Sequence, residues 1–186
     1  MRTTTVLTLV LLAGAPALLA GCQSDYSKQT EYEADRSAME RDASAIINEY
    51  KAADPTIERF FQEAAGYAVF PKIAKGGAIV GGAHGDGVVY EKGALVGFAE
   101  VSQGSIGAQL GGQTFSEIIF FQNESSLYNF KSGDMEFSAN ASAVAAESGA
   151  GAAADYQNGV AVFTKPRAGL MFEASIGGQK FDYYPR

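Results

Sequence analysis

Apolar residues recur at helical spacing between residues 30 and 54, ahead of any strand-like pattern. Thr30 and Glu33 have the spacing of a capping box, which marks the start of a helix. One side of the segment is apolar, and the segment carries seven acids against three bases. The pattern predicts a net acidic amphipathic helix. Its apolar positions are Met39, Ala43, Ile46, Ile47 and Tyr50.

A second, shorter helix is predicted directly after the first. Asp54 suits an N-cap, Pro55 suits the first helical position, and Gly66 is the expected stop. The apolar face of this helix comprises Ile57, Phe60, Phe61 and Ala64.

Short β-prone runs separated by glycine-rich turns follow from Tyr67 onward. A helix-like segment at 123–131, capped by Asn123, interrupts them. Its apolar positions are Leu127, Tyr128 and Phe130. The predicted strands are 67–70, 78–83, 88–90, 95–101, 105–110 and 115–121, and the turns between them include 85–87, 92–93 and 111–112.

The pattern leaves residues 137–154 open, because they are rich in Ala, Ser and Gly. Small residues suit a strand packed closely against another layer; a helix is the alternative, although Gly149 and Gly151 weigh against it. After this segment, Asn158-Gly159 predicts a hairpin turn between strands at 154–156 and 160–164.

Two strand-and-turn units occur twice. Residues 66–72 resemble 159–165, and residues 111–115 resemble 177–181. Because the two offsets differ, this is not a simple tandem repeat, and reused units in one antiparallel sheet system explain it. We predict an α+β fold, with N-terminal helices packed on a mostly antiparallel β-sandwich or barrel-like sheet system and one short helix inserted between strands.

The N-terminus has the build of a bacterial secretion signal. Arg2 supplies a positive charge, and the apolar run 6–19 is too short to span a bilayer comfortably. The run ends in Leu19-Ala20-Gly21-Cys22, which resembles the lipoprotein box, in which the cysteine thiol receives a diacylglyceryl group. We therefore predict a signal peptide at 1–21, a polar tether at 22–29 and a single domain at 30–186, with Cys22 as the lipid attachment site.

The charge and the single cysteine narrow the function classes. Cys22 is the sole cysteine, so no intramolecular disulfide forms. Removal of Arg2 with the signal changes the formal charge from −7 to −8, which argues against nucleic-acid binding through bulk charge. Acyl chains such as palmitate give a durable anchor. Gln23 after the cysteine favours the outer membrane, facing the periplasm, in a host with two membranes.

Several ordered motifs between Ile46 and Tyr184 resemble the SYLF lipid-binding domain. The motifs are 66–71, 75–77, 81–83, 85–90, 107–113, 130–133 and 169–178. The resemblance implies a compact β-rich domain with N-terminal helices, and lipid binding, with phosphoinositides and actin as ligands of eukaryotic members. Bacterial members are usually envelope lipoproteins. Lipid binding in eukaryotic members is associated with a basic N-terminal helix, whereas the predicted helix here is net acidic.

No residue pattern points to catalysis, a metal or a cofactor. His84 is the only histidine and lies in a glycine-rich turn, and no serine has a nucleophile-elbow motif. The histidine, cysteine and acidic residues have no metal-ligand spacing. The strand carboxylates Glu100, Glu117 and Glu173 are interpreted as satisfied or solvent-facing. We therefore predict no catalytic residue, no metal, no cofactor and no enzymatic activity.

Four cations form the one candidate ligand site. Lys72 and Lys75 follow one Ala-Val-Phe strand, and Lys165 and Arg167 follow its echo. If the two strands run alongside each other in the same direction, these four residues gather at one end of the domain and suit an anionic phospholipid headgroup. The alternative is four solvated residues at strand ends.

The sequence thus predicts a membrane-anchored, non-enzymatic lipid-binding module of the bacterial envelope. Its partner is membrane phospholipid, reached through Cys22 and a headgroup site, since anchoring raises the local concentration at the bilayer. The rival prediction is an envelope protein-interaction scaffold without a lipid site, whose acidic helix or exposed sheet edge docks an unknown partner protein.

Overall fold

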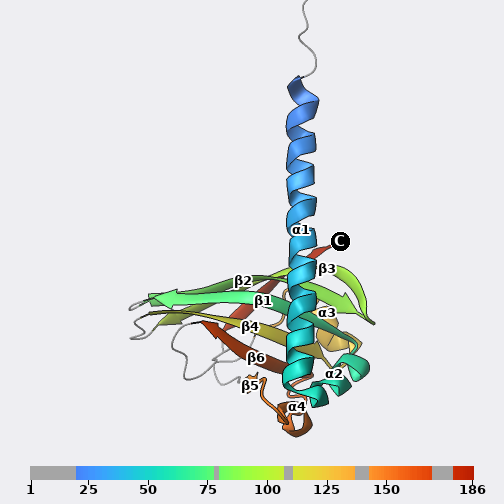
Figure 1. Ribbon diagram of the computed structural model, residues 1–186, viewed down its shortest axis with the longest axis vertical. Coiled ribbons are helices and arrows are strands. Elements are labelled where there is room, and N and C mark those ends of the chain that lie inside the picture. The colour runs from blue at the N-terminus through green and yellow to red at the C-terminus, as the bar shows by residue number, and fades with distance from the viewer. Residues whose placement is uncertain (1–19, 78–79, 107–110, 137–142, 169–177) are drawn as a thin grey trace, which may run out of the picture. The chain divides into compact units, whose positions relative to one another are not determined.

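The computed structural model describes residues 20–77, 80–106, 111–136, 143–168 and 178–186 (Figure 1). The chain divides into two compact units, Met1–Arg36 and Ser37–Arg186. The described part of the first unit is the beginning of helix α1 (Ala20–Ala53). The second unit contains the rest of that helix and all other described elements.

Helix α1 begins before the predicted capping box. It starts at Ala20 rather than at Thr30, so the segment 22–29, predicted as a polar tether, is helical in the structure. No proline lies in this stretch to stop a helix. In the second unit the predicted apolar stripe is correct, because Ala43, Ile46 and Tyr50 are buried.

Asp54 organises the turn after α1 and confirms the predicted cap. It precedes a 3-10 turn, η1 (Pro55–Ile57), which continues as α2 (Glu58–Glu63). Its carboxylate accepts hydrogen bonds from Thr56 N at 3.0 Å and from Gly151 N at 2.6 Å. Burial disfavours the charged carboxylate, but these hydrogen bonds outweigh burial and lower the pKa of Asp54. The cap thereby ties α2 to α4 (Ala150–Ala153).

The strands form one seven-stranded sheet in the order β5-β6-β4-β1-β2-β3-β7. All neighbours are antiparallel except the short pair of β5 and β6. The fold is therefore α+β, as predicted, with a single sheet. The strands are β1 (Gly66–Gly77), β2 (Val80–Glu91), β3 (Ala94–Ile106), β4 (Gly111–Phe121), β5 (Val144–Ala145), β6 (Val160–Ala168) and β7 (Gln179–Pro185).

The two faces of the sheet bury separate apolar clusters. On the face that we call the α1 face, Ala43, Ile46 and Tyr50 of α1 pack with Ile118 and Phe163. Within the second unit, α1 runs across the strands of this face (Figure 1). On the opposite side, the inner face, the cluster consists of Ala68, Phe70, Ile73, Ala83, Val89, Ala99, Val101, Phe115, Ile119, Phe121, Leu127, Phe130, Val162 and Phe181.

The sheet curls around its inner face. The rings of Phe70 on β1 and Phe181 on β7 lie 5.9 Å apart, although β2 and β3 separate these strands in the sheet. Helix α3 (Glu124–Lys131) covers the inner face, with Phe130 4.8 Å from Phe121 and 5.1 Å from Phe181 between ring centroids. Both apolar clusters lie between Met39 and Tyr183, so the second unit contains the complete described core.

Several predicted strands prove too short, because they continue through glycines that suggested turns. Strand β2 runs through residues 85–87, where glycine leaves room for a neighbour: a Cβ on Gly87 would lie 2.6 Å from the Phe70 ring. Strand β1 passes Pro71 at a bulge, a position that tolerates the missing N–H. The turn at Lys92-Gly93 is confirmed by positive φ angles of 51° and 80°.

The C-terminal predictions are partly correct. Asn158 and Gly159 have φ angles of 53° and 80°, as the predicted hairpin turn requires. The strand predicted at 154–156 is wrong, because α4 ends just before it and a single bridge forms at Gln157. In the open segment, 137–142 lies outside the described residues, 144–145 is strand β5 and 150–153 is helix α4. The predicted helix at 123–131 is α3, with the Asn123 side chain accepting from Ser126 N.

Candidate functional site

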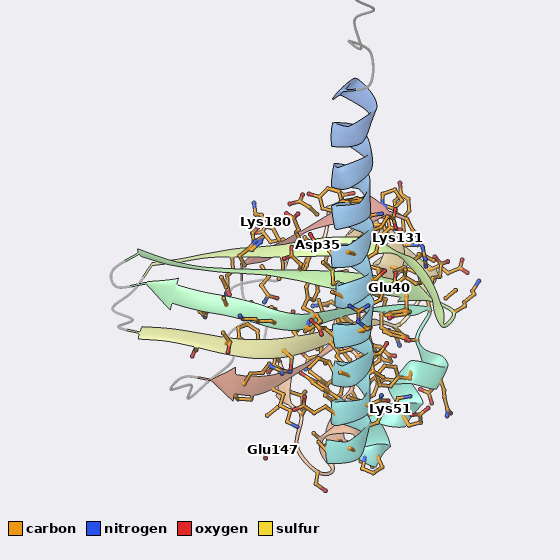
Figure 2. All side chains as sticks on the ribbon, turned by 45° about the horizontal axis from the view of Figure 1, so that its top comes forward. Asp35, Glu40, Lys51, Lys131, Glu147 and Lys180 are labelled. Carbon is orange, nitrogen blue, oxygen red and sulfur yellow. The ribbon has the colours of Figure 1, made fainter. Side chains whose placement is uncertain are left out.

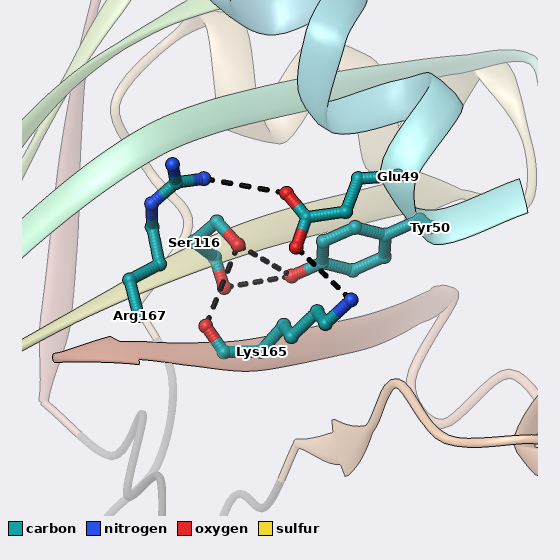
Figure 3. Close-up of polar contacts among 5 residues, drawn as sticks. All are labelled: Glu49, Tyr50, Ser116, Lys165 and Arg167. Carbon is teal, nitrogen blue, oxygen red and sulfur yellow. Dashed lines mark hydrogen bonds and ion pairs between the residues drawn. The ribbon is translucent and has the colours of Figure 1, made fainter. Parts of the chain in front are cut away.

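Two of the four predicted headgroup cations meet on the α1 face. Lys165 Nζ lies 3.0 Å from Glu49 Oε1, and Arg167 Nη1 lies 3.5 Å from Glu49 Oε2 (Figure 3). Lys165 and Arg167 are two positions apart on β6, Arg167 lies where the register with β4 shifts, and both side chains reach Glu49. Each oxygen of one carboxylate on α1 thus faces one cation of the sheet.

A buried hydroxyl beside Glu49 holds α1 against the sheet. Tyr50 Oη donates to the backbone oxygen of Ser116 at 2.8 Å and lies 3.2 Å from Ser116 Oγ (Figure 3). Ser116 Oγ in turn donates to the backbone oxygen of Lys165 at 3.4 Å. Burial raises the pKa of Tyr50, so its hydroxyl stays a donor at all ordinary pH values. The anchor therefore sets the register of Glu49 opposite Lys165 and Arg167.

Lys72 lies across β4 from Lys165. Strands β1 and β6 both pair antiparallel with β4, so they run in the same direction, as the proposed gathering of the cations requires. Ser116 pairs with Lys165 on one side, and the bulge of β1 that contains Lys72 faces it on the other. Lys72 is exposed and its neighbour Ile73 belongs to the inner cluster, so Lys72 points to the α1 face.

The predicted cluster of four is incorrect in one member, Lys75. It shares the side of β1 on which Ile73 is buried, and Lys75 itself is only 7% exposed. Burial lowers the pKa of its ammonium group. Lys72 and Lys75 are three positions apart in a regularly paired stretch of β1, so they lie on opposite faces. The bulge between Val69 and Lys72 decides which face each takes: the α1 face carries Lys72, Lys165 and Arg167, and Lys75 lies on the inner face.

Acidic residues occupy the other side of the α1 face. Across the strands, Lys72 pairs with Asp86, Asp86 with Glu100, and Glu100 with Asp182. The charge of Glu100 is the main reason why the pKa of Tyr184 is raised. The α1 face therefore carries Lys72, Lys165 and Arg167 over β1 and β6, and Asp86, Glu100 and Asp182, together with the exposed Lys180, over β2, β3 and β7.

The inner face contains a buried carboxyl group. Glu117 on β4 and Gln179 on β7 are both fully buried, and Gln179 Nε2 donates to Glu117 Oε2 at 3.2 Å. In the described part of the chain, the remaining oxygens Glu117 Oε1 and Gln179 Oε1 have no hydrogen-bond partner. Burial raises the pKa of Glu117 to about 8 despite the amide hydrogen bond, so the carboxyl is mostly neutral at pH 7.

The remaining candidates do not assemble into a site. His84 is exposed on β2 and lies 3.8 Å from Asp86, and Glu173 is outside the described residues. Within the described ranges, no group of three or more histidines, cysteines or acids is arranged to hold a metal ion. Cys22 belongs to the first turns of α1, and its side chain is outside the description. No helix in the described ranges combines the length and apolarity needed to cross a membrane.

Sequence reasoning missed Glu49, Tyr50 and Gln179 as partners in these arrangements. Glu49 was counted only among the acids of the helix, although its place beside the buried Tyr50 sets it at the edge of the apolar stripe. Gln179 belongs to the second echo, in which 177–181 matches 111–115. Nothing in the sequence indicates that it reaches Glu117, because that contact depends on the curl of the sheet.

Comparison with known protein families identifies the C-terminal part of the chain. Residues 102–183 match the family model described as Ysc84, Las17-binding protein actin regulator. This segment is similar to the Ysc84 (SYLF) family. This confirms the family that the sequence motifs resemble. None of the curated proteins compared matches the chain.

The Ysc84 match includes the whole pair of Glu117 and Gln179 and part of the arrangement on the α1 face. It covers Ser116, Glu117, Lys165, Arg167 and Gln179, and extends from the second half of β3 to β7. Helix α1 and strand β1 precede the matched segment and supply Glu49, Tyr50 and Lys72 to the arrangement on the α1 face. The match to this family supports, at most, a role as a lipid-binding or actin-regulating module.

Proposed function

We propose that this protein is a non-enzymatic lipid-binding module held at the bacterial envelope by acyl chains on Cys22. Its headgroup contact consists of Lys72, Lys165 and Arg167. The main observation behind this proposal is that three cations lie on the α1 face. They belong to β1 and β6, which flank β4 and run in the same direction as each other. Lysine and arginine side chains so arranged suit the phosphate of an anionic phospholipid.

The anchor follows from the N-terminal sequence. The apolar run ending at Cys22 matches what a lipoprotein box needs, and thioether-linked acyl chains hold the mature chain at a bilayer. In a host with two membranes, Gln23 favours the outer membrane and a periplasmic location. Anchoring makes a weak headgroup site sufficient, because it raises the concentration of the domain at the surface.

Vesicle flotation tests the headgroup contact. We expect residues 23–186, which lack the anchor but keep the complete described core, to float with vesicles containing phosphatidylglycerol and not with phosphatidylcholine alone. Double charge reversal, Lys165→Glu with Arg167→Glu, should abolish flotation. Lys180→Glu, at an exposed lysine of β7 on the acidic side, is the control for each single reversal, Lys165→Glu and Arg167→Glu. Unchanged flotation of the double variant would remove the headgroup site.

The anchor has its own test. In the host, Cys22→Ser should release the protein from the membrane fraction and remove the mass of the acyl chains. The rival function is a protein-interaction scaffold, which the family description, naming a Las17-binding protein, favours. A stoichiometric envelope partner recovered with the wild-type chain, in the absence of any vesicle binding by residues 23–186, would support that rival.

A further inference from the structure

We propose that Glu49 is an internal competitor of the lipid headgroup, whose carboxylate occupies the place that a phosphate takes between Lys165 and Arg167. This inference rests on the proposed function, because it concerns the same cations. It adds that α1 regulates the affinity of the site through one exposed side chain.

The geometry of the Glu49 carboxylate is that of a bridging anion. Its Oε1 faces Lys165 at 3.0 Å, and its Oε2 faces Arg167 at 3.5 Å (Figure 3). A phosphate also presents oxygens to an ammonium and a guanidinium at once, with more negative charge and more acceptor oxygens. Glu49 and a phosphate therefore compete for the same hydrogen-bond donors.

The carboxylate is free to leave without disturbing the fold. The Glu49 side chain is 42% exposed, and the Lys165 and Arg167 side chains are 29% and 43% exposed. Ion pairs at such positions contribute little to stability. The adjoining Tyr50 keeps its buried hydrogen bond to Ser116, so α1 stays in place while the Glu49 side chain rotates into solvent.

The surrounding charges make this exchange selective for an anion that brings additional oxygens. Lys72 lies across β4 and is not ion-paired with Glu49 among the contacts of the described residues. A headgroup phosphate displacing Glu49 gains both partners of the carboxylate and approaches Lys72. The acids over β2 and β3 repel the same ligand and limit it to the β6 side of the face.

The test compares Glu49→Gln with a matched variant of the same helix. Glu40, labelled on α1 in Figure 2, pairs with Arg186 at 3.9 Å rather than with the headgroup cations. Glu49→Gln and Glu40→Gln remove the same charge, so only the former frees Lys165 and Arg167. We use residues 23–186 and vesicles of phosphatidylglycerol and phosphatidylcholine in a one-to-three ratio.

We expect Glu49→Gln to bind these vesicles about two- to fivefold more tightly than wild type, since a surface ion pair contributes up to about 1 kcal/mol. Glu40→Gln should stay within about 1.5-fold of wild type. In the double variant Glu49→Gln with Lys165→Gln, the gain in affinity for the vesicles should be lost, because the competing carboxylate and one of its two cationic partners are both absent.

The outcomes separate this inference from the proposed function. If the wild type binds and Glu49→Gln gains no more than Glu40→Gln, the competitor role is wrong while the headgroup site stands. If neither the wild type nor Glu49→Gln binds the vesicles, both ideas fail. Inorganic phosphate identifies the source of the ligand: phosphate that prevents vesicle binding at low millimolar concentration would overturn the lipid assignment in favour of a free anion.

Discussion

Glu49 and Glu117 are two glutamates of one domain that the sheet places in opposite surroundings. Glu49, on the α1 face, is 42% exposed and lies between two cations. Glu117, on the inner face, is fully buried and receives one hydrogen bond from an amide. The first contributes to the surface charge that a ligand meets. The second is mostly neutral at pH 7, because burial raises its pKa to about 8.

The difference shows that the two faces of the sheet have different roles, one in stability and the other in binding. The inner face closes the curled sheet through aromatic rings and the pair formed by Glu117 and Gln179, so changes there should affect stability. The polar edge of the α1 face consists of exposed ion pairs around a buried anchor, so changes there should affect binding. Four predictions test this division, from the largest expected effect to the smallest.

Phe130→Ala should cause the largest loss of stability. The ring is fully buried between Phe121 and Phe181, and removing such a ring costs about 3–5 kcal/mol of unfolding free energy. Tyr128→Ala on the same helix is the control, because Tyr128 is 68% exposed, and should change the value by less than about 0.5 kcal/mol. Urea denaturation measures both. Equal losses would mean that α3 does not close the inner face.

Glu117 should make stability fall with rising pH. Its folded pKa of about 8 lies above the reference value of 4.5, so the folded state binds the extra proton between these values. The stabilisation is complete below pH 4.5 and is lost as the pH rises through 8, a loss of roughly 3 kcal/mol between pH 5 and pH 8. Glu117→Gln keeps the size of the side chain but removes the titrating group, so it should flatten this part of the dependence of unfolding free energy on pH. An unchanged slope in the variant would contradict the assignment.

Tyr50→Phe should weaken the contact between α1 and the sheet by about 1 kcal/mol. The substitution keeps the ring but removes the hydroxyl that donates to the Ser116 oxygen at 2.8 Å. Because Glu49 is adjacent, the variant should also bind anionic vesicles differently from wild type. Thermal unfolding and flotation of the same sample measure the two effects. A variant as stable as wild type would show that the hydroxyl is not the anchor.

Glu49→Gln should change stability least. The ion pairs with Lys165 and Arg167 are partly solvated, so the unfolding free energy should move by less than about 1 kcal/mol. The loss should shrink further in 0.5 M salt, where exposed charges are screened. Urea denaturation at two salt concentrations checks it. A loss of several kcal/mol would place Glu49 in the structural part of the molecule.

Local sequence patterns correctly predicted those features that neighbouring residues determine. The Asp54 and Asn123 caps and the Asn158-Gly159 turn depend on neighbouring residues, and the structure contains all three. The strand limits were less accurate, because glycines inside β2 relieve contacts with β1 rather than make turns. The strand predicted at 154–156 failed because the preceding small residues form α4 and not a hairpin arm.

The candidate site was likewise predicted only in part from the sequence. The two strands of the echo, 66–72 and 159–165, were assumed to run side by side in the same direction. They do run in the same direction, but β4 lies between them. The echo grouped Lys75 with Lys72, whereas their odd spacing along β1 places them on opposite faces, and the bulge at Pro71 decides that Lys72 is the one on the α1 face. A bulge of this kind depends on hydrogen bonding to two neighbouring strands at once, which a linear pattern does not contain.

The sequence by itself determined most of the element types, the acidic helix, the family and the positions of the cations along the chain, because these depend on residue identity and short spacing. Tertiary structure alone decided which charges meet. The approach of α1 brings Glu49 to Lys165 and Arg167 over more than a hundred residues of chain, and the curl of the sheet brings Gln179 to Glu117. Contacts between distant segments depend on packing and on sheet geometry, and therefore the two glutamates differ only in the folded molecule.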